Sequence, residues 1–134
     1  MVRISRGRQD GLPSTTPTDT FTGSVRGDSV LPREDGAMVL TVVFAPGART
    51  HWHTHTGGQV LFVTHGEGYV QTRAGNAARV RAGDVVHFAP DEEHWHGAGP
   101  STYLVHTAVS IGETDWLDAV TDDEHAAGVQ AGSR

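Results

Sequence analysis

Short runs of strand-forming residues, separated by glycine and proline, make up most of this 134-residue chain. Met38–Ala45 is rich in β-branched residues and is closed by Pro46 and Gly47, and seven similar runs follow it. Many short strands joined by turns are typical of a β-barrel or β-sandwich, and the alternating helices of a parallel α/β sheet are missing. The later predicted strands are Thr50–Thr56, Gly58–His65, Glu67–Arg73, Ala77–Arg81, Val85–Ala89, Trp95–Gly97 and Thr102–Ile111.

The two ends of the chain differ from this strand-rich middle. Residues 1–22 hold two prolines and many serines and threonines, so we predict an irregular N-terminal arm there. Residues 23–134 are predicted to form a single domain, because the length suits one core and no internal repeat is visible. Asp115–Ala127 is the segment predicted to be helical, with Trp116 and Val120 on its buried face.

Glycine and proline positions predict the turns. Phe21–Arg26 is a candidate first strand, and the stretch from Gly27 to Gly36, which contains Pro32, is predicted to be mainly turn. Gly66 lies between two strand-like runs and is predicted to be the turn of a β-hairpin.

Composition excludes several classes of function. The formal net charge of −6 and the scattered arginines argue against a nucleic-acid partner, which requires a basic surface. Cysteine is absent, which excludes disulfides, thiolate catalysis and cysteine-based zinc sites. No apolar stretch reaches the roughly 18–20 residues of a membrane span, and the N-terminal residues lack the apolar core of a signal peptide. We therefore expect a cytoplasmic protein that acts on a small molecule, with no membrane partner.

Histidine points to a metal site or to proton chemistry. Seven of the nine histidines lie between His51 and His96, inside strand-like sequence. Side chains alternate along a strand, so His53 and His55 share one face and can bind the same ion. Gln59 follows His55 by four residues, across Gly57 and Gly58, where the chain can turn. His94 would complete the site from a facing strand. His51 has the same parity as His53 and is kept as a pocket-lining or surface residue.

Two segments resemble the two motifs of the cupin superfamily. Residues 47–66 have the glycine, histidine and glutamine spacing of the first motif, and residues 83–94 are similar to the second. The resemblance implies an all-β double-stranded β-helix, the cupin or jelly-roll barrel, here followed by a short C-terminal helix. It also implies one divalent metal ion per chain, held in the mouth of the barrel. The implied metal ligands are His53, His55, Gln59 and His94.

The chain departs from the family pattern in three places. Gln59 stands where a glutamate is usual, so the ligand set is neutral and leaves the charge of a divalent ion uncompensated. The expected proline is displaced from Ala89 to Pro90, and Asp91 replaces a turn glycine. Aspartate tolerates left-handed backbone better than most residues, so we expect the turn before His94 to persist.

A further histidine is a candidate acid or base. In Thr102–Ile111 the even positions share one face, and if this face lines the barrel mouth, His106 points towards the metal. An unligated histidine beside a Lewis acid can transfer protons. The alternative is a buried structural histidine bonded to a backbone carbonyl. His87 and His96 are further candidates for the lining of the site, whereas Trp52 and Trp95 are expected on the outer face of the barrel.

A narrower resemblance covers about residues 21–125. The strings that carry it are Phe21–Arg26, Pro46–Thr50, Trp52–His55, His94–Gly97, Asp115-Trp116 and Val120–Asp122. On these strings the chain is similar to small manganese-dependent bacterial cupins that include (R)-selective hydroxynitrile lyases. The likeness implies reversible addition of cyanide to an aldehyde such as benzaldehyde, a mandelonitrile lyase activity, with weaker nitroaldol activity. It also implies Mn(II) as the favoured ion and His106 as the proton shuttle. It further implies a homo-oligomer, a dimer or tetramer, that forms by exchange of N-terminal strands, with Phe21–Arg26 as the exchanged edge strand.

The same ligands are compatible with two other functions. An iron- or copper-dependent cupin dioxygenase would use the same side chains, with open positions for oxygen and substrate. A non-catalytic barrel that binds a metal or a small molecule would need no acid or base. Fe(II), Zn(II), Ni(II) and Cu(II) are alternatives to Mn(II), because imidazole and amide ligands suit several first-row ions.

Overall fold

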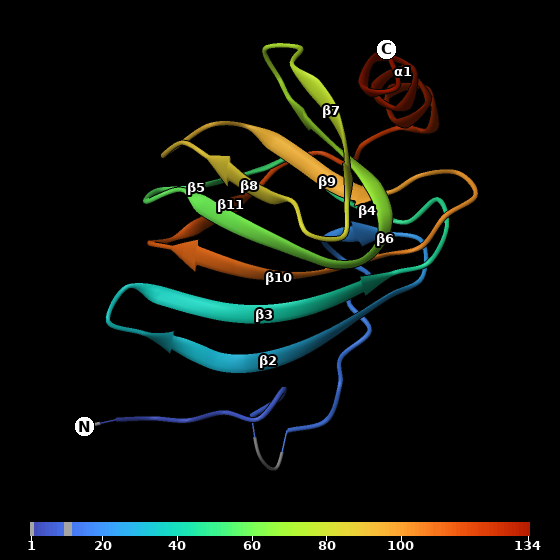
Figure 1. Cartoon of the computed structure of the whole chain (residues 1–134). Helices are drawn as coiled ribbons and strands as arrows, with labels where there is room; N and C mark the ends of the chain where they lie inside the picture. Colours follow the sequence, from blue (N-terminus) through green and yellow to red (C-terminus); the bar gives the residue numbers. More distant parts are fainter. Residues whose placement is uncertain (1, 10–11) are drawn as a thin grey trace.

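Antiparallel strands form a nearly closed barrel in which two curved layers of sheet face each other (Figure 1). The computed structural model describes residues 2–9 and 12–134. The strands follow the order β1-β4-β9-β6-β10-β3-β2, while β7 and β8 pair with β6, and β5 pairs with β9 and β11. The predicted all-β barrel with a short C-terminal helix is confirmed. The elements are β1 (Phe21–Thr22), β2 (Val25–Glu34), β3 (Ala37–Phe44), β4 (Arg49–Thr50), β5 (His53–His55), β6 (Gln59–Thr72), β7 (Ala77–Arg81), β8 (Val85–Phe88), β9 (His94–Ala98), β10 (Leu104–Ile111), β11 (Thr114–Trp116) and α1 (Asp122–Gly132).

The long strand β6 joins the two layers. Its first half pairs with β8 and β10, and its second half pairs with β7 and β9. The chain passes through Gly66 without turning back, so the predicted hairpin at this glycine is wrong. Gly66 has φ 76°, and a Cβ atom there would lie 2.0 Å from the carbonyl oxygen of Tyr103. Glycine is therefore needed for a bend between layers, which resembles a hairpin turn in sequence alone.

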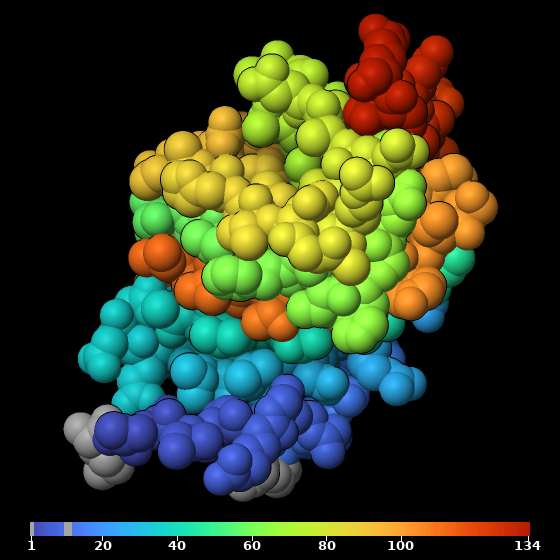
Figure 2. All heavy atoms as spheres, in the orientation of Figure 1, coloured from blue at the N-terminus to red at the C-terminus, as the bar shows by residue number. Residues whose placement is uncertain are grey.

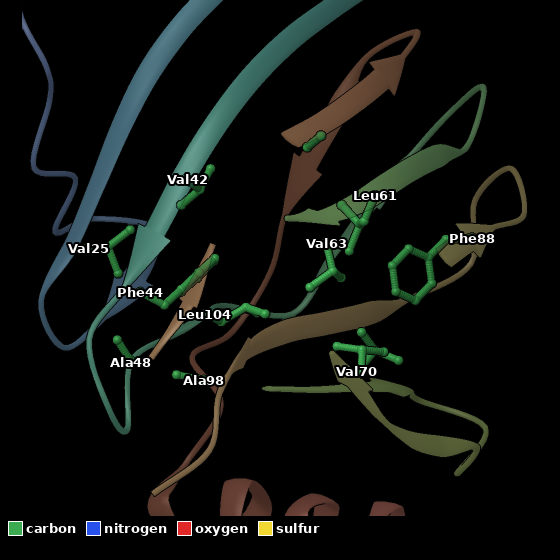
Figure 3. Packing of buried hydrophobic residues seen from close by; sticks show 12 residues of the cluster. Val25, Val42, Phe44, Ala48, Leu61, Val63, Val70, Phe88, Ala98 and Leu104 are labelled. Carbon is green, nitrogen blue, oxygen red and sulfur yellow. The ribbon is translucent and has the colours of Figure 1, made fainter. Parts of the chain in front are cut away.

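The core lies between the layers and is built by alternate residues of the strands (Figure 3). Phe44, Leu61 and Leu104 come from three neighbouring strands and are almost completely buried. Full burial of a side chain of this size contributes about 1.5–3 kcal/mol. The even positions of β10 all point inward, while the odd positions are partly exposed, as the alternation predicted.

The prediction of a turn from Gly27 to Gly36 is also wrong, because most of this stretch belongs to β2. β2 is an edge strand with two irregularities in its pairing to β3. An edge strand tolerates Pro32, since no partner requires its missing N–H group. The N-terminal arm lies against this edge (Figure 2). Thr15 and Gly27 exchange two backbone hydrogen bonds of 2.8 Å.

The predicted helix was also misplaced. Residues 115–116 belong to β11, and α1 begins only after Thr121. The Thr121 side chain accepts a hydrogen bond from the Glu124 backbone N–H, and the Glu124 carboxylate accepts one from the Thr121 N–H. This capping box fixes the start of the helix. Trp116 is 40% exposed rather than buried, whereas Val120 is buried just before the helix.

A second apolar cluster holds α1 against the barrel. Trp52, Tyr69, Trp95 and Val120 form this cluster, separately from the main core. Trp52 and Trp95 therefore pack beneath the helix rather than in the site. The predicted strand over residues 50–56 divides into β4 and β5. No helix in the described part of the chain is long and apolar enough to span a membrane.

Candidate active site

A small cavity of about 50 Å³ lies between the layers and is lined by both histidines and apolar side chains. Larger hollows under the N-terminal arm, lined by Arg3, Pro32 and Glu34 among others, contain no histidine. The polar part of the lining includes His53, His55, Gln59, His96, His106 and Ser110. The apolar part consists of Phe21, Met38, Leu40, Val42, Ala108 and Trp116.

The four residues predicted as metal ligands lie together. His53 and His55 extend from β5, and His53 is paired in register with His94 on β9. The ring centre of His53 is 5.0 Å from that of His55 and 4.3 Å from that of His94. Gln59 is the first residue of β6, and its Oε1 lies 3.0 Å from His94 Nε2. All four side chains are buried.

Two of these imidazoles are oriented by backbone carbonyls. His53 Nδ1 donates to the carbonyl oxygen of His51, and His94 Nδ1 donates to that of Glu92, both at 2.8 Å. A neutral imidazole that carries its proton on Nδ1 presents a bare lone pair at Nε2. His53 Nε2 is buried and has no hydrogen-bond partner among the described residues. Such outer partners are typical of histidines that bind metal.

The other two candidate ligands are oriented by side chains. Thr114 Oγ1 lies 3.0 Å from His55 Nδ1, and His55 Nε2 has no partner within the described chain. Gln59 Nε2 donates to Ser110 Oγ at 3.0 Å, which turns Oε1 towards His94. The lone pairs of Gln59 Oε1 and His94 Nε2 thus face each other, an arrangement that a bound cation would relieve. The residues therefore fit a metal ion.

Burial keeps these imidazoles neutral. It lowers the pKa of His94 to about 3 and that of His55 to about 4, and it holds the pKa of His53 well below its ordinary value. Nearby imidazoles add to the lowering at His53 and His94, and the Arg33 charge adds to it at His55. Metal binding requires deprotonated imidazole, so the side chains are in the state that an ion needs.

A pair of histidines adjoins this group. His106 Nε2 lies 2.9 Å from His96 Nδ1, and both side chains are buried. The partner of His106 Nε2 is thus another imidazole. Potential ligand atoms of His53, His94 and His96 all lie within 4.8 Å of one another. His106 Nδ1 is buried without a partner in the part of the chain that the structure describes.

Two other predicted positions have different outcomes. His87, a candidate for the lining, is exposed on β8 and is not part of the cavity wall. His51 is half-buried and supplies its carbonyl oxygen to His53 rather than an imidazole to the site. Asp91 adopts the expected left-handed backbone, with φ 62°, and its N–H donates to the carbonyl oxygen of His55. This turn places the Glu92 carbonyl beside His94.

The orienting partners were not found from the sequence. Ser110 belongs to the inward face of β10, which alternation could have suggested. Thr114 and the carbonyl of Glu92 carry no sequence signal, because only the folded chain brings them to the histidines.

The family follows from a direct match. Residues 40–107 match the cupin domain family. The chain belongs to the cupin family. It is 45% identical over 115 residues to an (R)-mandelonitrile lyase from Granulicella tundricola, covering 81% of this chain and 88% of that protein. It resembles a cupin-like protein from Thermotoga maritima with a TM-score of 0.82 and 40% identity, over 90% of this chain and 97% of that one.

A second curated relative is similar over a shorter stretch of the chain. An acireductone dioxygenase from Gluconobacter oxydans is 34% identical over 77 residues, which are 55% of this chain and 41% of that protein. The implied double-stranded β-helix is confirmed by the cupin match and by the solved relative.

Proposed function

We propose that this cupin is a metal-dependent lyase of the hydroxynitrile type, which reversibly adds cyanide to an aldehyde. The observation that carries the proposal is the arrangement of free imidazole nitrogens beside the His96–His106 pair, in a chain that is 45% identical to a mandelonitrile lyase. This arrangement combines a place for a Lewis acid with a buried group that can carry a proton.

His53, His55, Gln59 and His94 would hold one divalent ion. Their Nδ1 and amide partners fix the side chains before any ion binds, so little ordering is required. When bound, the ion would supply Lewis acidity towards a carbonyl or hydroxyl oxygen. All four donors are neutral, so no carboxylate reduces that acidity. Mn(II) is the proposed ion, with Fe(II), Zn(II), Ni(II) and Cu(II) as the alternatives to be compared.

His106 is the proposed acid and base. Burial lowers its pKa to about 4, so it is neutral at neutral pH and can accept a proton. Its Nε2 is engaged by His96, and its buried Nδ1 has no partner within the described chain. In cyanohydrin cleavage, His106 would remove the hydroxyl proton as the carbon–carbon bond to cyanide breaks. In the reverse direction, it would return that proton to the oxygen of the aldehyde.

The experiment is metal reconstitution. Metal-free protein would be loaded with Mn(II), Fe(II) or Zn(II), and the release of aldehyde from mandelonitrile and from the shorter lactonitrile would be followed. Cleavage of at least one cyanohydrin that depends on the ion supports the proposal. A His87→Ala variant is the matched control, since it removes an exposed histidine and should keep both metal and activity. Stoichiometric metal binding without cleavage of either cyanohydrin contradicts the proposal.

A dioxygenase is the second candidate, favoured by the likeness to the acireductone dioxygenase. The same ligands could hold iron or copper, with oxygen as a co-substrate. Oxygen uptake by the iron-loaded protein in the presence of enediol substrates, without cyanohydrin cleavage, would support it. A binding protein without catalysis is the remaining reading, and it would bind metal but show neither activity.

A homo-oligomer is part of the proposal. In the described chain the N-terminal arm pairs with β2 of its own barrel, through Thr15 and Gly27. The same hydrogen bonds could be made to the β2 edge of a second copy, which would convert the arm into an exchanged element. Sedimentation of the full chain and of a chain lacking the arm would test this, because loss of the arm should yield monomers.

A further inference from the structure

Trp116 connects the wall of the cavity with the surface of the molecule. It is the last residue of β11, and its side chain lines the cavity together with the candidate ligands. The other described residues of the lining are buried or half-buried, whereas Trp116 is 40% exposed. The cavity is therefore closest to solvent beside this side chain. We propose that Trp116 binds the aromatic ring of an aryl cyanohydrin or aryl aldehyde at the opening of the cavity. This inference rests on the proposed function and names a residue that sets its substrate preference.

The position of Trp116 favours contact with a ligand over a packing role. Among the described residues, the main core and the cluster beneath α1 are both formed without it. A large apolar ring that stays partly in water gains free energy when an apolar group covers it. A bound substrate is one source of such a group, because the ring already faces the cavity.

The opening is mostly apolar, and the polar groups lie deeper in the cavity. The half-buried members of the lining are Phe21, Met38, Leu40 and Thr114. The candidate ligands His53, His55 and Gln59 are buried. A molecule with one oxygen and one apolar group would therefore place its oxygen towards the imidazoles and its apolar group beside Trp116. No charged side chain is among the described residues that line the cavity, so an uncharged group is favoured at the opening.

Aromatic neighbours make the opening suited to an aryl group in particular. The ring centres of Trp116 and Phe21 are 5.6 Å apart, and that of Trp116 is 4.6 Å from that of His53. Favourable aromatic pairs have their ring centres about 4.5–7 Å apart, so the exposed part of Trp116 can take one more ring at a similar distance. A methyl group at the same place makes a smaller contact and has no ring to pair. Mandelonitrile should therefore be preferred to lactonitrile.

Substitutions at Trp116 separate ring binding from support of the metal site. Trp116→Leu removes the aromatic face and keeps an apolar side chain, whereas Trp116→Phe keeps a ring. Leu117→Ala is the matched control, because Leu117 is the next residue, is 39% exposed and does not line the cavity. Trp116→Ile, which favours strands, replaces the leucine variant if that variant does not fold.

The test compares kcat/KM for mandelonitrile and lactonitrile in the Mn(II)-loaded protein and its variants. Loss of a fitting contact in an apolar pocket is worth about 10- to 200-fold. Trp116→Leu should lower kcat/KM for mandelonitrile at least about tenfold, mainly through a higher KM, and that for lactonitrile less than about twofold. Trp116→Phe should recover most of the loss, and Leu117→Ala should match the wild-type protein.

Binding without turnover gives a second readout. Benzaldehyde binding to the Zn(II)-loaded protein would be followed by ligand-observed NMR, and Mn(II) affinity by electron paramagnetic resonance titration. Trp116→Leu should weaken benzaldehyde binding by a similar factor and leave the affinity for Mn(II) unchanged.

The outcomes separate this inference from the function on which it rests. An unchanged preference between the two cyanohydrins in Trp116→Leu overturns the inference and leaves the lyase proposal intact. An equal loss for both cyanohydrins with weaker Mn(II) binding also overturns it, because the ring would then support His53 instead. Cleavage of neither cyanohydrin by the metal-loaded wild-type protein contradicts the lyase proposal. Benzaldehyde binding then still decides the role of Trp116, since equal binding by the wild-type protein and Trp116→Leu overturns it.

Discussion

Replacing Thr114 with valine should weaken metal binding without altering the fold. Thr114 Oγ1 lies 3.0 Å from His55 Nδ1 and can accept its proton, which leaves Nε2 free for a metal ion. Valine has the same shape and favours strands, so the pairing of Thr114 with His55 should be kept. The substitution leaves a buried Nδ1–H group without a partner whenever Nε2 binds an ion.

The size of the effect follows from that unpaired group. A buried donor without a partner costs about 1–3 kcal/mol. At about 1.4 kcal/mol per factor of ten, the dissociation constant for the ion should rise about 5- to 150-fold. The constant would be measured with Mn(II), by following the electron paramagnetic resonance signal of the free ion during titration.

The matched control removes a threonine hydroxyl elsewhere in the same sheet. Thr107 Oγ1 lies 3.1 Å from Thr41 Oγ1, and Thr107 has the outward parity of β10. Thr107→Val should leave the dissociation constant unchanged. An unchanged Mn(II) affinity in a correctly folded Thr114→Val protein would refute the argument that Thr114 prepares His55 for metal.

Three further predictions concern the ligands and the fold. Gln59→Glu should bind Mn(II) at least about tenfold more tightly, because a carboxylate adds charge attraction. Cyanohydrin cleavage by this variant should fall, because the added negative charge reduces the Lewis acidity of the ion. Titration and kinetics on one sample check both. Thr121→Ala should destabilise the protein by about 1 kcal/mol through loss of the helix cap, seen as a lower urea midpoint. Burial lowers the folded-state pKa of His94 to about 3, so below pH 6.5 the unfolded chain binds more protons than the folded chain. The metal-free protein should therefore lose stability as the pH falls. His94 alone should cost about 2 kcal/mol at pH 5, and an unfolding midpoint that does not change between pH 7 and pH 5 would contradict this.

The barrel could be predicted from the sequence because its strands are short, alternating and separated by turn residues. The inward parity of β10 is an example, since each even position has a buried side chain. The bend of β6 could not be predicted, because Gly66 serves a close approach to the carbonyl of Tyr103 that only the fold creates. The start of α1 was placed too early, because Asp115-Trp116 pairs with β5, a contact between distant segments.

The candidate site, like the fold, could be predicted only in part from the sequence. Motif spacing predicted which side chains would gather, and His53, His55, Gln59 and His94 do lie together, while their role as ligands remains a prediction. The contact between His96 and His106 depends on how β9 and β10 lie across the barrel, which no local pattern encodes. The cavity is lined by side chains from several strands, so its full lining could be described only with the structure.

The proposed site combines a bound metal ion with a separate residue that acts as acid and base. Comparing His106→Ala with His94→Ala tests this combination directly. Bound manganese and cyanohydrin cleavage would be measured on the same samples. We expect His106→Ala to keep one ion per chain and to lose cleavage, and we expect His94→Ala to lose both. Cleavage at the wild-type rate by manganese-loaded His106→Ala would show that His106 is not the acid and base.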